Sequence, residues 1–410
     1  MDNQNKLRVI IVGSGLAGLT AARILREHHD VTVYERAHKS AATGGQGISI
    51  SPNAVKILER IGYDRNKAGA VPIYGFRSYD KDGNVKKDHE ADLKTRYGAD
   101  QLTQRRSDFV SELTRLATES STELKIQGNP AKIVYETGVV DIDTEKGSVV
   151  LSNGTTAEAD VVIVADGVHS RLRKHILGDD TIKAQKMGLT CYRVAASTEA
   201  VKEALGSLPH WWEPTTAQNR VCVLESGDGT DRFVVVYPLR HQEYMNFSCI
   251  FPSRESKQSR ANSWFAEADS DEIIEIFHDF DESFRKILGV STEVKYWELQ
   301  DLDPLPTWTR GRAIVIGDAA HAMTPLQGQG ANQSIEDAES FLLLRGVKSE
   351  DVPKALKHID SLRRPRATKV LEDTRGMARE VSWEERMAKY DFLFSYEGIL
   401  EAQKQNQIPT

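Results

Sequence analysis

The chain has 410 residues, of which 40% are hydrophobic and 28% charged, and this length allows two or three domains with separate buried cores. The formal net charge of -7 argues against a nucleic-acid-binding protein, because binding nucleic acid requires a clustered basic face. No apolar run approaches the roughly 20 residues of a membrane-spanning helix, and the polar stretch from Met1 to Lys6 does not resemble a signal peptide. We therefore predict a globular cytoplasmic protein without a membrane span.

The first predicted elements form a β-α-β unit. Residues 7–12 and 31–34 are β-branched apolar runs that predict two strands, and the apolar spacing of residues 16–26 predicts a helix between them. This order is typical of a dinucleotide-binding fold.

Gly13, Gly15 and Gly18 spell G-x-G-x-x-G between the first strand and the helix. This spacing lets the backbone approach a pyrophosphate, to which the helix N-terminus offers partial positive charge. Glu35 ends the second strand, 22 residues after Gly13, where a carboxylate accepts hydrogen bonds from a ribose and repels a 2'-phosphate. The site, to which we also assign Arg36, therefore favours FAD or NAD over NADP. The alternative is a tight structural turn beside a surface glutamate.

A second pattern extends from residue 189 to residue 300. Strand-like stretches at residues 191–195, 220–224, 233–237 and 245–251 alternate with polar turns, which predicts an antiparallel sheet in a separate layer. Residues 271–288 have apolar and aromatic side chains at helical spacing, so we expect a helix or a helix pair with its aromatic residues in the core of this layer.

The cysteines have no C-x-x-C spacing, so neither a zinc site nor a disulfide framework is expected. Each lies in a strand-like apolar segment, which predicts buried and unreactive thiols. They are Cys191, Cys222 and Cys249.

The last part of the chain contains one more strand and several helices. Residues 313–316 predict a buried strand, and residues 331–344 and most of residues 352–390 have helical patterns. Acidic residues closely follow the densest basic run, so we interpret this run as a solvated helix face or an internal ion-pair site. The run consists of Arg363, Arg364 and Arg366.

Two further motifs follow predicted strands. In the run ADVVIVADGVHSRLR, Asp166 begins a D-G-x-x-S-x-x-R pattern that ends at Arg173. In the run GRAIVIGDAAHAMTPLQGQGANQSIEDA, residues 311–338, Asp318 stands at the end of a buried strand, and a glycine-rich turn then opens a helix. Taken alone, Asp166 and Gly167 are also compatible with a simple turn and helix cap.

With the first glycine turn, these motifs make nearly the whole chain resemble the single-component flavoprotein aromatic hydroxylases, the group of p-hydroxybenzoate hydroxylase and salicylate hydroxylase. The resemblance implies an α/β fold with a Rossmann-like FAD-binding domain at residues 1–188 and 301–350. It also implies an antiparallel-sheet substrate domain at residues 189–300 and a C-terminal helical region at residues 351–410. Residues 70–100 are candidates to join the substrate layer.

The family assigns FAD contacts to the two later motifs. The carboxylate at the position of Asp318 binds the ribityl chain, and the motif around Asp166 supports the pyrophosphate region and is associated with NAD(P)H use. The helix after the glycine-rich turn is expected to direct its backbone N–H groups at the flavin pyrimidine edge and to stabilise the anionic reduced flavin. The residues expected there are Gly328, Gly330, Ala331 and Asn332.

Two other segments are assigned to the flavin by the resemblance. Arg106 stands where the family places an arginine against the FAD phosphates, with a surface arginine as the alternative, and we expect Ser107 to cap the next helix. Residues 45–53, GQGISISPN, resemble the loop that passes the flavin ring, which assigns Gly47 to the cofactor. Many members have a small residue where this chain has Gln46, so the contact there is expected to differ and could reach the substrate.

The substrate is expected between the flavin ring and the antiparallel sheet. Arg193 is our candidate to bind a phenolate, carboxylate or carbonyl, and Tyr237 is our candidate to relay a proton or hydrogen-bond the substrate. The alternatives are a structural ion pair and a core tyrosine. Pro325 matches a proline that lines the oxygen-transfer site of the family, and His321 is interpreted as a packing or hydrogen-bonding residue. No positional argument selects four further candidates for the pocket wall: His210, Trp211, Trp212 and His241.

The resemblance implies a monooxygenase that uses NADPH or NADH as a transient electron donor and dioxygen as the oxidant. It would hydroxylate or epoxidise an aromatic, heterocyclic or other electron-rich small molecule through a flavin hydroperoxide, with no metal. The alternatives are a non-oxygenating flavin oxidoreductase, either a reductase or a halogenase-like enzyme, and a binding protein that has kept the nucleotide fold. The sequence lacks the G-W-x-W-x-I-P segment usual in such halogenases. It leaves open whether the protein is a monomer or a homodimer.

Overall fold

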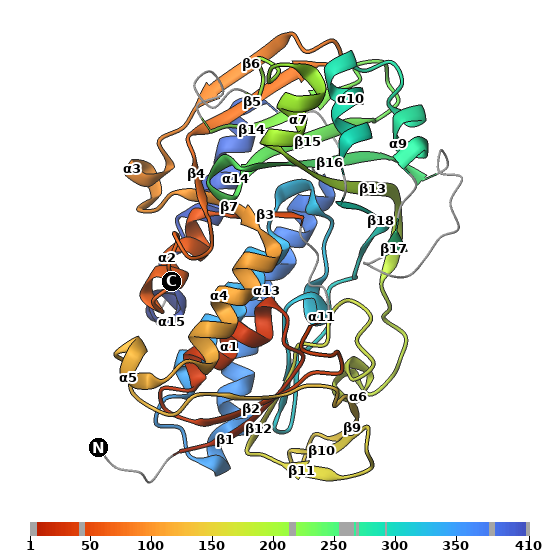
Figure 1. Ribbon diagram of the computed structural model, residues 1–410. Helices are drawn as coiled ribbons and strands as arrows, with labels where there is room; N and C mark the ends of the chain where they lie inside the picture. The colour runs from red at the N-terminus through yellow and green to blue at the C-terminus, as the bar shows by residue number, and fades with distance from the viewer. Residues whose placement is uncertain are drawn as a thin grey trace.

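The computed structural model describes residues 6–40, 46–212, 219–253, 266–267, 270–291, 293–376 and 382–406. A six-stranded sheet with its helices forms the lower part of the molecule in Figure 1, and an eight-stranded sheet forms the upper part. Residues 1–5 and Gly45, the first residue of the expected flavin loop, lie outside the described residues. The parallel sheet, the second sheet layer and the C-terminal helices confirm the expected fold class.

The six-stranded sheet is parallel apart from its antiparallel edge pair. Residues 9–12 and 161–164 are buried, so its two middle strands form the centre of a core covered on both faces. In order across the sheet the strands are β19 (Thr309–Arg310), β20 (Ala313–Val315), β12 (Val161–Val164), β1 (Arg8–Val12), β2 (Asp30–Tyr34) and β8 (Lys132–Val134).

The eight-stranded sheet is antiparallel except at one junction, where β14 and β5 run parallel. The antiparallel layer expected at residues 189–300 is thus extended by β5 and its hairpin partner β6, which reach it by a long connection from the nucleotide-binding part and add one parallel pair. In order the strands are β17 (Ala266–Glu267), β18 (Glu293–Asp301), β13 (Gln185–Ser197), β16 (Tyr244–Pro252), β15 (Phe233–Leu239), β14 (Val221–Glu225), β5 (Gly75–Asp80) and β6 (Val85–Glu90).

The other described strands form two three-stranded sheets. One consists of β3 (Gly47–Ile50), β7 (Gln101–Arg105) and β4 (Val71–Ile73), and the other of β11 (Thr156–Glu158), β10 (Ser148–Leu151) and β9 (Val139–Asp143). The helices up to residue 290 are α1 (Leu16–Leu25), α2 (Pro52–Arg60), α3 (Leu93–Tyr97), α4 (Arg106–Thr118), α5 (Ser121–Leu124), α6 (Arg173–Leu177), α7 (Thr198–Leu205), α9 (Ser270–Ile276) and α10 (Glu282–Val290). The later ones are α11 (Asp318–His321), α12 (Gly330–Glu339), α13 (Val352–Arg375), α14 (Trp383–Phe394) and α15 (Ile399–Asn406). The short 3-10 turns are η2 (Arg240–Gln242), η4 (Pro325–Gln327), η5 (Ser340–Leu344) and η6 (Ser349–Asp351).

The two faces of the eight-stranded sheet differ in burial. On β14, Cys222 and Leu224 are 3% and 0% exposed, whereas the alternate residues Val221 and Val223 are partly exposed. We call the first side the packed face and the second side the open face. The packed face forms one core with Phe284 of α10 and with Phe277 and Phe280, which lie between α9 and α10; this confirms the helix pair and its interpretation as core. In Figure 1, α7, α9 and α10 lie beside this sheet, away from α1 and β1.

The remaining structural expectations concern the cysteines and the basic run. All three cysteines are buried free thiols, and burial raises the pKa of Cys191 to about 11 and that of Cys222 to about 12. Within the basic run, Arg363 and Arg366 both pair with Glu336, a residue that is 0% exposed. The internal ion-pair interpretation is therefore confirmed. Among the described residues, no helix combines the length and the hydropathy that a membrane crossing requires.

Candidate active site

The three glycines of the first turn have different surroundings. A Cβ atom on Gly13, whose φ is +101°, would lie 2.4 Å from the carbonyl oxygen of Ala165, and one on Gly18 would lie 2.0 Å from that of Gly13. Both positions therefore allow the close backbone packing that joins β1 to α1 and β12. Gly15 has no atom within 4 Å of its Cβ position, so its backbone faces open space at the start of α1.

Glu35 lies beside this turn at the end of β2. Its carboxylate accepts hydrogen bonds from the backbone N–H of Ser14 at 2.8 Å, from the Ser14 hydroxyl at 2.9 Å and from the N–H of Ala37 at 2.8 Å. These contacts hold the carboxylate next to the glycine turn. Arg36 is exposed, and its Cβ lies 3.4 Å from the Cβ position of Gly138.

Asp166 follows β12 and borders the same turn from the other side. Its Cα lies 3.4 Å from the Cβ position of Gly13. One carboxylate oxygen accepts from the N–H of Arg171, while the other is buried without a hydrogen-bond partner, and burial raises the pKa of this carboxyl. Such an unsatisfied buried oxygen requires an explanation, and a bound donor would provide one. Arg173, the last residue of this motif, donates to the carbonyl of Ala319 at 3.0 Å and so links the motif to α11.

Asp318 is the first residue of α11, directly after β20. The preceding Gly317 has a φ of +62°, and its Cβ position lies 2.9 Å from the Cβ of Ala17 in α1. A carboxylate oxygen of Asp318 lies 3.9 Å from the Cβ position of Gly330, the first residue of α12. The first glycine turn, Asp318 and the start of α12 are therefore adjacent, because α1 packs against α12 and its Ala17 approaches Gly317.

The start of α12 is connected to the segment after β3. Asn332 accepts a hydrogen bond from the N–H of Ser51 at 2.8 Å and donates to the carbonyl of Gly328 at 2.6 Å. Gly328 is left-handed, with a φ of +64° and no atom within 4 Å of its Cβ position. The side chain of Asn332 is thus used inside the protein, and the backbone N–H groups of the first helical turn remain for a ligand.

A network of buried charged side chains holds the turn before Asp318 in place. Asp337 of α12 accepts from the N–H of Gly317 at 3.0 Å, from His321 at 2.6 Å and from Arg363 of α13 at 3.0 Å. His321 also packs against Trp308, with ring centroids 5.3 Å apart and an interplanar angle of 35°. His321 therefore packs and hydrogen-bonds, as the sequence suggested. Asp337 was missed, since a carboxylate in the middle of a helix has no local signal for such a contact.

Arg106 is the first residue of α4, and Arg105 occupies its N-cap position without a side-chain cap. The expectation that Ser107 caps this helix was wrong, because the N-cap and the helix start lie two residues earlier, at Arg105 and Arg106. Burial lowers the pKa of Arg106, the charge of Arg193 lowers it further, and the charge of Asp318 acts in the opposite direction. Arg106 is therefore within electrostatic reach of both Arg193 and Asp318, although the three residues come from separate segments.

β3 brings the expected flavin loop against the open face of the eight-stranded sheet. The N–H of Gly47 donates to the side-chain carbonyl of Asn246 on β16 at 2.8 Å. A Cβ atom on Gly47 would lie 2.5 Å from the ring of Tyr237 and 2.8 Å from Asn246. Only glycine fits this contact. Gln46 is 4% exposed and its side-chain nitrogen has no hydrogen-bond partner.

Arg193 and Tyr237 lie on the open face. The guanidinium of Arg193 stacks on Trp297 of β18 at 4.1 Å from the ring centroid, and its Nε is buried without a partner. Neither Arg193 nor Arg106 has an ion-pair partner within the described ranges. Burial raises the pKa of Tyr237 to about 12, and the nearby charge of Arg193 opposes this shift. Pro325 opens η4, and the next residue, Leu326, packs on the apolar cluster around Trp297.

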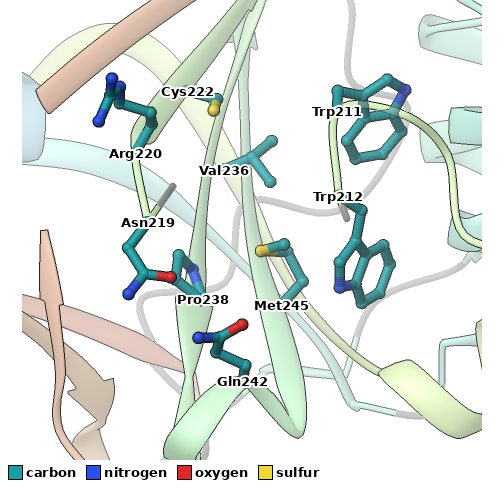
Figure 2. A pocket seen from close by; sticks show the side chains of 9 residues that line it. All are labelled: Trp211, Trp212, Asn219, Arg220, Cys222, Val236, Pro238, Gln242 and Met245. Carbon is teal, nitrogen blue, oxygen red and sulfur yellow. The ribbon is translucent and has the colours of Figure 1, made fainter. Parts of the chain in front are cut away.

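Trp211 and Trp212 belong to the packed face, on the opposite side of the sheet. Figure 2 shows them across a small pocket from Val236 and Met245. These tryptophans therefore do not line the space that contains Arg193 and Tyr237, because their loop folds over the other side of the strands. His241 is exposed in the turn between β15 and β16.

The residues around the glycine turn and α12 fit an FAD nucleotide. Gly15, Gly167 and Gly328 leave open space beside backbone that is otherwise tightly packed, and one oxygen of Asp166 lacks a donor. Donor groups are available at two helix starts, α1 and α12. Among the residues that the structure describes, no three His, Cys, Asp or Glu side chains come together as a metal site.

The family model described as "FAD binding domain" matches residues 6–374. The chain belongs to this family. Hispidin-3-hydroxylase of Neonothopanus nambi is 28% identical over 97% of each chain. The 6-hydroxynicotinate 3-monooxygenase of Pseudomonas fluorescens is 31% identical over 88% of this chain and 89% of the relative. A solved salicylate hydroxylase substrate complex superimposes with a TM-score of 0.72 at 27% identity, over 99% of both chains.

These similarities show that the protein is an FAD-dependent monooxygenase of the aromatic hydroxylase group. The structure also places two polar residues on the open face that the motifs did not reveal. Asn246 and Ser248 are polar residues that alternate with apolar ones in β16, and this alternation is a signal from which they could have been found.

Proposed function

We propose that this monooxygenase consumes NADPH or NADH and inserts one oxygen atom of dioxygen into an aromatic or otherwise electron-rich small molecule, by hydroxylation or epoxidation. The names of three relatives refer to aromatic compounds, namely hispidin, 6-hydroxynicotinate and salicylate. One observation supports the proposal above others. The charges of Arg193, on the open face of the sheet, and of Asp318, on the nucleotide side, both act on the buried guanidinium of Arg106.

The proposed FAD site uses three groups of contacts. The glycine turn (Gly13, Gly15 and Gly18) holds the pyrophosphate together with Asp166, while Glu35 and Arg36 hold the adenosine end. Asp318 accepts hydrogen bonds from the ribityl hydroxyls, and Arg106 neutralises phosphate charge. The flavin ring is then bounded by Gly47 and by the N–H groups at the start of α12, from the residues Gly328, Gly330, Ala331 and Asn332.

The bound, reduced flavin supplies the electrons and the activation of dioxygen. The tasks left for the chain are to bind the substrate, to exclude water and to hold protons. In our proposal Arg193 holds an oxygen of the substrate, because a guanidinium remains charged at any working pH. Tyr237 remains protonated at neutral pH because burial raises its pKa to about 12, so it donates a hydrogen bond instead of acting as an anion. Pro325 lines the site where the oxygen atom is transferred.

We keep the division into an FAD-binding domain, a substrate domain at residues 189–300 and a C-terminal helical region as part of this proposal. β5 and β6 belong to the sheet of the substrate layer. The substrate domain thus includes a hairpin from residues 75–90 in addition to the later strands.

The decisive experiment is turnover under labelled dioxygen. The purified protein is expected to carry FAD, to oxidise NADPH or NADH faster when a substrate is present, and to form a product with one labelled oxygen atom. Salicylate, 6-hydroxynicotinate and hispidin are the first compounds to test. Turnover of a substrate without dioxygen would replace the proposal by a flavin reductase, and a colourless protein that does not take up FAD would contradict it altogether.

A further inference from the structure

The open face of the eight-stranded sheet extends beyond Arg193 and Tyr237. In the strand register Arg193 lies opposite Ser248, Ser248 opposite Val235 and Val235 opposite Val223. Paired residues of neighbouring strands point to the same side of a sheet, so these side chains form one row across four strands. On the next strand, Phe76 of β5 lies opposite Val221 of β14 and belongs to the same face.

The polarity changes along this face. The end on β13 and β16 carries Arg193, Ser248 and Asn246, which are hydrogen-bonding side chains. In the middle, β15 carries Val235 and Tyr237, and β14 carries Val223 and Val221. On β5, Ser78 lies opposite Val223 and Phe76 lies opposite Val221. The far end of the face carries the ring of Phe76. One face therefore offers a polar end, an apolar centre and an aromatic end.

The aromatic end is a pair of stacked rings. Phe76 stacks on Tyr390 of α14, with centroids 5.7 Å apart and an interplanar angle of 27°. Tyr390 in turn stacks on Phe394 at 4.9 Å and 11°. Two contacts from α3 hold α14 in place, because Tyr97 packs edge-on against Phe394 and donates to Asp391 at 2.7 Å. α14 also contacts α2, so it connects the Phe76 end of the sheet to the helix after β3.

Simple core packing does not account for this face. The opposite sides of the same strands are filled, and Leu224 and Val236 are 0% and 1% exposed. Val221, Val223 and Val235 are partly exposed, and so are Phe76 and Tyr390. Apolar side chains of this kind, continuous with a proposed substrate site, are available to a ligand.

We propose that the open face binds an extended planar aromatic substrate of at least two rings. The ring that receives oxygen lies at Arg193 and Tyr237, and the distal ring lies over the valines against the Phe76–Tyr390 pair. Neighbouring strands are about 4.8 Å apart, so β5 lies about 10 Å from β15, a span that one ring does not cover. This inference rests on the proposed function, since it assumes that the oxygenated ring binds at Arg193.

The test compares two probes that share one polar ring, salicylate and 5-phenylsalicylate. Binding to the FAD-loaded protein is measured without turnover, from the change in flavin absorbance or by calorimetry. We expect 5-phenylsalicylate to bind about 10- to 100-fold more tightly, because its second ring is buried. Phe76→Ala and Tyr390→Ala should each reduce this preference about fivefold or more.

Phe392→Ala is the matched control, because Phe392 is on the same helix and is 37% exposed. It should leave the preference unchanged. If either alanine variant has a lower melting temperature, Phe76→Leu and Tyr390→Leu decide, since leucine keeps an apolar side chain without a stacked ring. Equal affinities for the two probes, no binding of the longer probe, or an unchanged preference in the Phe76 and Tyr390 variants would overturn the inference. Loss of FAD or of NAD(P)H oxidation in the wild-type protein would instead contradict the proposed function.

Discussion

The two sides of the proposed active site are built from different parts of the chain. On the nucleotide side, backbone atoms form most of the proposed contact surface. Gly13 and Gly18 allow the strands and the helix to pack closely, and the Cβ position of Gly15 faces open space. On the sheet side the backbone groups of the strands are used in the ladder, and only side chains such as Arg193, Tyr237 and Asn246 are available. The first side tolerates few residue types at each position, whereas the second can change its ligand by exchanging side chains. We expect substitutions on the two sides to separate FAD binding from turnover.

The largest effect is expected for Gly15→Val. A Cβ atom at this position has no atom within 4 Å, so the substitution opens onto free space at the start of α1 and the apoprotein should still fold. The Kd for FAD should rise by about 100-fold or more, because the nucleotide can no longer approach the backbone. Titration of apoprotein with FAD, followed by fluorescence, measures this.

Gly289→Val is the control for that variant. Gly289 is exposed in α10 and far along the chain from the glycine turn, with one side-chain atom 4.0 Å from its Cβ position. Its FAD affinity should equal that of the wild type. Normal FAD binding by Gly15→Val would show that the turn has no role in the nucleotide site.

On the sheet side, Arg193→Ala should retain FAD and lose activity. Removing a charged hydrogen-bond donor to the substrate should lower kcat/KM by about 30-fold. Lys295→Ala is the matched control, because Lys295 lies opposite Arg193 in the same row. Full activity of Arg193→Ala would contradict a role of Arg193 in substrate binding. Loss of FAD from this variant would contradict the proposal that the sheet side serves turnover and not FAD binding.

A smaller effect is expected for Asp318→Asn. The carboxylate is replaced by an amide of the same shape, so only the charge of the acceptor is lost, and the Kd for FAD should rise about tenfold. Asp82→Asn, in an exposed turn, serves as the reference. If both variants bind FAD equally well, the ribityl contact assigned to Asp318 is wrong.

The smallest effect concerns pH and is confined to the nucleotide side. His29 accepts a hydrogen bond from the N–H of Leu7, and burial lowers its pKa to about 4. Between pH 6.5 and pH 4 the unfolded chain binds a proton at this histidine and the folded protein does not. The free energy of unfolding should therefore fall with decreasing pH, by up to about 1.4 kcal/mol per pH unit from this group.

Denaturation of the His29→Gln variant should show a weaker pH dependence over this range. His278→Gln, at an exposed position in the substrate layer, should keep the wild-type dependence. The same pH slope in both variants would show that His29 is not the group responsible.

Local sequence patterns determined most elements and the FAD motif of this protein. β-branched runs, helical spacing and glycine positions depend on neighbouring residues, so β1, α1, β2 and the start of α12 were found with small errors at their ends. The misplaced cap at Ser107 was such an error, because several adjacent residues are compatible with a helix start.

Tertiary structure decided what those patterns cannot contain. Period-two alternation shows which residues of a strand share a face, but it does not show which face the core covers. The assignment of Trp211 and Trp212 to the packed face, the parallel pairing of β14 with β5 and the stack of Phe76 on Tyr390 join segments far apart in the chain. These three features result from the packing of whole layers against one another. This packing contributes to the free energy of folding, but it cannot be read from a short window of sequence.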